Sequence, residues 1–98
     1  MKEIIHHSPF GGSYTLDITV GRYSNGQTRI QLFDTEDGMP YATATVAIEK
    51  HLESDEVAIK DYSENAGILE ALVTAGIVYP PHSYLQQNFV KIPICRMK

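Results

Sequence analysis

The fold is decided by the stretch Leu16–Leu32, which reads LDITVGRYSNGQTRIQL. Apolar residues alternate with polar ones on both sides of the turn signal Ser24-Asn25-Gly26, and this period of two indicates two strands that each bury one face. A three-residue loop that ends in a glycine bulge pairs Val20 with Ile30 and keeps both apolar sets on the same face. We therefore expect an antiparallel hairpin with a loop of that length.

A second turn signal, Glu36-Asp37-Gly38, leads into another alternating stretch at residues 42–48. The same loop length would pair Leu32 with Ala42 and place Phe33 opposite Tyr41 on the back of the sheet. Residues 57–59 predict a short fourth strand, and residues 89–95 predict a final one.

The final strand places Val90, Ile92 and Ile94 on one face. Because Pro93 cannot donate to a strand ladder, we expect this strand at a sheet edge, or paired on one side only at the proline.

One helix is expected over residues 64–75, with Ser63 as its N-cap and Glu64 in its first turn. Its apolar residues form one stripe, and Gly76 predicts a left-handed C-terminal cap. The sequence therefore predicts an α+β fold in a single domain, residues 1–98. Its architecture is an antiparallel β-meander of four to five strands with one α-helix packed on one face.

Acidic residues are concentrated in the middle of the chain. Ten of the twelve carboxylates lie between Asp34 and Glu70, where only Lys50 and Lys60 oppose them, so this stretch carries −8 and its flanks +4. Such a field repels phosphate and attracts basic partners. With a net charge of −4, we expect no direct binding of nucleic acid.

The sequence predicts a cytoplasmic protein that does not enter membranes. No apolar run approaches the ~20 residues needed to span a bilayer, and the first residues lack the apolar core of a signal peptide. Cys95 is the only cysteine, which excludes an internal disulfide and agrees with a reducing compartment.

No motif for catalysis, metal binding or phosphate binding is present, so we expect no catalytic residues, no metal and no cofactor. Adjacent His6 and His7 on a strand would point to opposite sides, which leaves at most one for any site. Two alternatives remain. One is a small enzyme or ligand-binding protein that uses Cys95 with a histidine. The other is a structural or regulatory homodimer built through the edge of the C-terminal strand.

The candidate partner-binding surface consists of acidic loop residues and a nearby tyrosine, because tyrosine suits protein interfaces. Tyr79 and Tyr84 lie in or beside neighbouring loops. The residues assigned to this surface are Glu36, Asp37, Glu53, Asp55, Glu56, Asp61, Tyr62 and Glu64.

Three segments together resemble a family of small bacterial proteins of unknown function that are carried on phages, plasmids and conjugative elements. They are LFDTEDGMPYAT at 32–43, DYSENAG at 61–67 and FVKIPICR at 89–96. The resemblance implies an accessory factor of a mobile genetic element. We therefore expect a non-enzymatic protein-binding factor, specifically an anti-CRISPR or anti-restriction inhibitor whose acidic surface meets a basic host nuclease.

Overall fold

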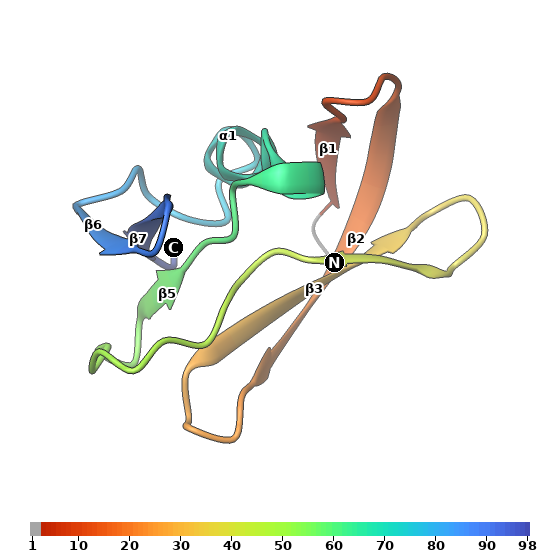
Figure 1. Cartoon of the computed structure of the whole chain (residues 1–98). Helices are drawn as coiled ribbons and strands as arrows, with labels where there is room; N and C mark the ends of the chain where they lie inside the picture. The colour runs from red at the N-terminus through yellow and green to blue at the C-terminus, as the bar shows by residue number, and fades with distance from the viewer. Residues whose placement is uncertain (1–2) are drawn as a thin grey trace.

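The computed structural model describes residues 3–98 of the chain, which form two β-sheets and one α-helix (Figure 1). In chain order the elements are β1 (Glu3–His7), β2 (Ser13–Arg22), β3 (Thr28–Asp34), β4 (Pro40–Thr43), β5 (Glu56–Ala58), the 3₁₀ helix η1 (Ser63–Asn65), α1 (Ile68–Thr74), β6 (Ser83–Gln87) and β7 (Val90–Arg96).

The first sheet is an antiparallel meander with strand order β1-β2-β3-β4, and the second is a three-stranded sheet with order β5-β7-β6. The α+β class, the four-stranded meander and the single α-helix are thus confirmed. The sequence did not reveal that β5, β6 and β7 form a sheet of their own.

The hairpin β2–β3 has the predicted register. Val20 lies opposite Ile30, and the backbone N–H of Tyr23 donates to the carbonyl of Gln27 at 2.8 Å, which closes the loop Ser24-Asn25-Gly26. The three-residue loop is therefore confirmed.

The hairpin β3–β4 has part of its predicted register but a loop one residue longer than predicted. Its loop spans residues 35–38, because the N–H of Asp34 donates to the carbonyl of Met39 at 2.9 Å. A bulge then restores the pair Leu32 and Ala42 but places Phe33 opposite Pro40, so the expected pair with Tyr41 is wrong. The extra residue in the loop is compensated by the bulge.

Thr45 joins the two sheets and ends the expected strand 42–48 early. Its hydroxyl accepts the N–H of Ile30 at 3.2 Å, while the Ala44 carbonyl accepts the N–H of Lys60 at 2.8 Å. Together with the bond from the N–H of Val46 to the Ala58 carbonyl at 3.0 Å, this bond forms the bridge between Thr45 and Ile59. The chain leaves the first sheet here and enters the second.

The C-terminal strand lies in the middle of its sheet, so its expected place at an edge is wrong. The alternative, pairing on one side only at the proline, agrees with the strand ladders, because Pro93 is paired with Tyr84 of β6 and with no residue of β5. β5 ends at Ala58, opposite Ile94, one residue before the proline would have to donate. Pro93 only accepts, from the N–H of Ile59 at 2.9 Å. With β5 and β6 on either side, β7 is not the edge strand on which the alternative of a homodimer was based.

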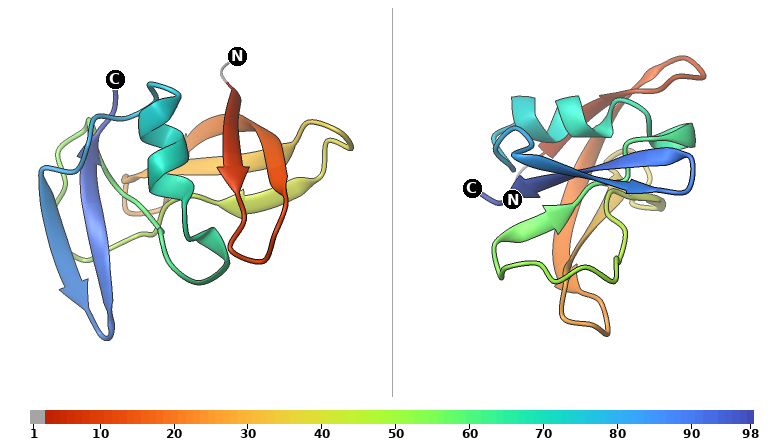
Figure 2. Two further views of the ribbon diagram at one scale, coloured as in Figure 1. Left: turned by 90° about the horizontal axis from the view of Figure 1, so that it is seen from above. Right: turned by 60° about the vertical axis from the view of Figure 1, so that its left-hand side comes forward.

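Helix α1 lies between β1 and the β6–β7 hairpin (Figure 2, left). The predicted stripe is buried: Ile68 and Leu72 are 0% exposed and join the main core, while Leu69 and Val73 pack against it. Fully burying each such side chain contributes roughly 1.5–3 kcal/mol. None of the helices within residues 3–98 is long and apolar enough to cross a membrane.

The helix starts four residues later than predicted. The capping group is Asp61, whose Oδ1 accepts the N–H groups of Gly67 and Leu69 at 3.0 Å each, and Ser63 instead begins η1 with a φ of 55°. The predicted C-terminal cap is confirmed, because the N–H of Ile77 donates to the carbonyl of Leu72 at 3.0 Å.

Residues 65–67 bend away from a helix because they are anchored to two strands. Asn65 is 2% exposed and donates its side-chain N–H to the carbonyl of Thr43 at 2.8 Å, and the Ala66 carbonyl accepts from His6 Nε2 at 2.8 Å. Gly67 has a φ of 98° and passes so close to β1 that an added Cβ would lie 3.3 Å from the His7 carbonyl oxygen.

The Gly67→Ala variant should therefore lose more stability than Gly11→Ala in urea denaturation. Both glycines have positive φ, 98° and 105°, and a Cβ at such a φ costs about 1–2 kcal/mol. Only Gly67 adds a tight contact, whereas a Cβ on Gly11 meets nothing within 4 Å. We expect an extra loss of about 1 kcal/mol at Gly67. Equal losses would contradict the close approach of α1 to β1.

Candidate functional site

The structure separates the predicted acidic residues into three groups. The β3–β4 hairpin tip and the loop before β5 lie at opposite ends of the molecule, with the start of α1 between them (Figure 1). Among the described residues, the members of the candidate partner-binding surface therefore do not form one contiguous surface. The groups are Glu36 and Asp37 at the tip, Glu53, Asp55 and Glu56 before β5, and Asp61, Tyr62 and Glu64 before α1.

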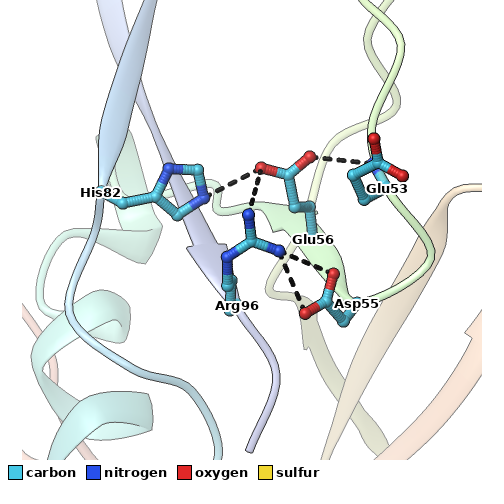
Figure 3. A network of polar contacts seen from close by, with 5 residues as sticks. All are labelled: Glu53, Asp55, Glu56, His82 and Arg96. Carbon is cyan, nitrogen blue, oxygen red and sulfur yellow. Dashed lines mark hydrogen bonds and ion pairs between the residues drawn. The ribbon is translucent and has the colours of Figure 1, made fainter.

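The group before β5 is part of an ion-pair network (Figure 3). Arg96, from β7, donates through Nη1 to both carboxylate oxygens of Asp55, at 2.9 and 3.1 Å. Glu56 faces His82 Nε2 at 2.9 Å and accepts the backbone N–H of Glu53 at 2.8 Å. This network holds the loop, β7 and the segment before β6 together.

These contacts use much of the negative charge of that loop. The Arg96 guanidinium lies within 4.0 Å of both Asp55 and Glu56, and the Glu56 side chain is only 13% exposed. A basic partner would have to compete with this arginine. This group therefore stabilises the fold and is less suited to binding a basic partner.

The group before α1 is also engaged within the protein. Asp61 caps the helix, and Lys60 Nζ lies 3.1 Å from Glu64 Oε1 and over the ring of Tyr62 at 5.7 Å. A hydrogen bond from the Glu64 backbone, followed by the pairing with Lys60, lowers the pKa of the Glu64 carboxyl. Lysines also cover the rings of Tyr79 and Tyr84, so these tyrosines neighbour positive charge.

The hairpin tip differs from the other two groups. Glu36 and Asp37 are exposed, and neither makes an ion pair with another residue of 3–98. The turn fixes the backbone around them, since Asp34 Oδ1 accepts the N–H of Glu36 and Asp37 Oδ1 accepts the N–H of Met39, both at 2.9 Å.

Two residues of this tip were missed by the sequence reasoning. Asp34 adds a third carboxylate, and the side chain of Met39 is 60% exposed directly beyond the turn. Both residues belong to the turn DTEDGM at 34–39. The sequence could have indicated them, because this turn carries three carboxylates and a large apolar residue that lies outside any alternating strand pattern that would bury it. We call residues Asp34–Met39 the acidic tip.

The histidines on β1 point to opposite sides, as expected. His6 is 0% exposed and donates through Nε2 to the Ala66 carbonyl, and in the neutral ring its Nδ1 accepts the Tyr41 hydroxyl at 2.8 Å. Burial, followed by the neighbouring Tyr14 and Asp34, raises the pKa of Tyr41 and keeps this hydroxyl a donor. Within residues 3–98, no group of three or more His, Cys, Asp or Glu is placed to hold a metal ion.

Cys95 does not have the surroundings of a nucleophile. Its side chain is 0% exposed in the main core, and burial, with a smaller effect from Asp61, raises its thiol pKa to about 11. A nucleophilic cysteine needs access and a lowered pKa. The geometry therefore gives no support to chemistry at this residue.

Replacing Glu56 should cost more stability than replacing Asp55, although both bind Arg96. Glu56→Ala leaves the Glu53 N–H and the His82 ring without their acceptor, and hydrogen bonds to charged groups contribute about 1.5–3 kcal/mol. Asp55→Ala removes a half-exposed ion pair, for which we expect a loss below about 1 kcal/mol. Urea denaturation of both variants measures the difference, and a larger loss for Asp55→Ala would contradict the network as described.

Native Cys95 should react slowly with iodoacetamide. With a pKa of about 11, roughly one thiol in a thousand is ionised at pH 8, before burial further limits access. Labelling followed by mass spectrometry should be at least about 100-fold slower than in protein unfolded by urea, which is the control. Labelling of native protein at the unfolded rate would show that the thiol is accessible.

Comparison of the chain with protein-family models, curated proteins and solved structures finds no match to any of them.

Proposed function

We propose that the protein is a non-enzymatic accessory factor of a mobile genetic element that acts in the cytoplasm by binding a host nuclease. Its acidic tip contacts a basic, nucleic-acid-binding surface of that nuclease and so competes with the nucleic acid. The specific role is counter-defence, as an anti-CRISPR or anti-restriction inhibitor. The resemblance of three segments to proteins of mobile elements supports this context.

The observation that carries the proposal is the state of the acidic tip. The carboxylates of Glu36 and Asp37 are exposed, that of Asp34 is half-buried, and none of the three makes an ion pair within residues 3–98. The Asp34 and Asp37 carboxylates accept backbone N–H groups and so fix the turn, which projects from the first sheet (Figure 1). A rigid turn loses little conformational freedom on binding. Exposed Met39 adds apolar area beside the charges, as interfaces require.

The role of the acidic tip can be tested by charge reversal at matched sites. Glu36→Lys/Asp37→Lys should weaken binding to a responsive nuclease at least tenfold, because close charge pairs across interfaces couple by about 1.5 kcal/mol or more. The control, Glu49→Lys/Glu53→Lys, makes the same change in net charge in the loop before β5, where neither side chain makes an ion pair with another described residue.

The measurement is pull-down and inhibition of cleavage with a panel of purified CRISPR effector and restriction nucleases. Retained binding by the control and loss by the tip variant supports the proposal. Equal loss in both variants would mean that net charge alone matters. Unchanged inhibition by the tip variant would overturn the acidic mechanism.

A further inference from the structure

A groove runs between the outer strand β1 and helix α1. Its volume is about 400 Å³, and its walls are formed by Ile4 and Ile5 from the strand and by Ala71, Thr74 and Ala75 from the helix. Small side chains on that side of α1 keep the groove open. Ile5 is 53% exposed beside it.

The open edge of β1 presents backbone groups to this groove. The N–H of Ser8 donates to the carbonyl of Gly12, and hydrogen-bonded pairs of an antiparallel ladder recur at every second residue. The backbone groups of His6 and Ile4 therefore face β2, while the N–H and C=O of Ile5 point away from it. β1 is the outer strand of its sheet, so these groups lie on the unpaired edge.

Two carboxylates also line the groove. Glu3 lies on β1 and Glu70 on α1, both are exposed, and neither makes an ion pair with another residue of 3–98. Their charge disfavours a phosphate or an acidic segment and favours a basic side chain between strand and helix. The apolar walls suit the aliphatic stem of lysine or arginine.

We infer that this groove binds an extended, basic segment of a partner protein, which adds its backbone to the open edge of β1. In this mode main-chain hydrogen bonds supply affinity, and side-chain pockets supply specificity. The ammonium or guanidinium group of the segment lies between Glu3 and Glu70. The inference does not depend on the acidic tip, which belongs to the opposite edge of the same sheet.

The probe is the capped peptide Lys-Val-Lys-Val-Lys, titrated into ¹⁵N-labelled full-length protein and followed by NMR. The amide signals of Ile5, His7, Glu70 and Thr74 should shift, while the capped peptide Glu-Val-Glu-Val-Glu should leave them unchanged. Equal shifts with both peptides, or shifts confined to other residues, would overturn the inference.

Variants separate the charge from the backbone contribution. Glu3→Gln/Glu70→Gln should weaken binding of the lysine peptide about three- to tenfold. Ile5→Pro removes an N–H that the β1–β2 ladder does not use, so it should abolish binding and leave the sheet paired. If Ile5→Pro unfolds the protein, Thr74→Trp, which fills the groove from an exposed helix position, takes its place.

The matched control is Glu36→Gln/Asp37→Asn, which removes the same number of charges at the acidic tip. It should bind the lysine peptide as the unmodified protein does. If this control loses as much affinity as Glu3→Gln/Glu70→Gln, the peptide responds to net charge and the groove is not its site. Loss of nuclease binding by the tip variants with retained peptide binding would leave the groove intact.

Discussion

The position of α1 depends on hydrogen bonds that tie the segment Asp61–Gly67 to the first turn of the helix and to two strands. Asp61 caps the helix, Asn65 reaches the backbone of β4, and Ala66 accepts from the buried ring of His6 on β1. These contacts place the helix beside β1 and thereby create the groove between them. They also explain the sequence DYSENAG at 61–67 as a segment that anchors the helix, because the side chains of Asp61 and Asn65 form hydrogen bonds within the protein.

The acidic residues between Asp34 and Glu70 produce separate local electrostatic fields, because the fold places them at different ends of the molecule. The molecule is 36 Å long, whereas charges are screened over about 8 Å at physiological ionic strength. Charges at the hairpin tip and before β5 therefore do not reinforce each other (Figure 1). Arg96 lies 40 residues beyond Glu56 and supplies a positive charge that is missed when charges are counted only between Asp34 and Glu70.

Local patterns were sufficient for the elements whose partners are close in sequence. The register of β2 and β3 follows from alternation and one glycine turn, and the C-terminal cap of α1 follows from Gly76. The placement of β7 between β5 and β6, and the late start of the helix, depend on contacts such as Asn65 to Thr43, which no local period encodes. The same limit applies to the site: exposure of the tip follows from its turn, but neutralisation of Asp55 requires knowing where Arg96 lies.

Thr45 lies where the two sheets meet, and its role there depends on the hydrogen bonds of its hydroxyl group and not on the shape of its side chain. Its hydroxyl receives the N–H of Ile30 and lies 3.1 Å from the Tyr23 hydroxyl, while its main chain pairs with Ile59. Valine has nearly the same volume and an equal preference for strands, but it offers no oxygen to a buried amide. During evolutionary drift this position should therefore admit serine before valine, although hydropathy and size alone would rank them the other way.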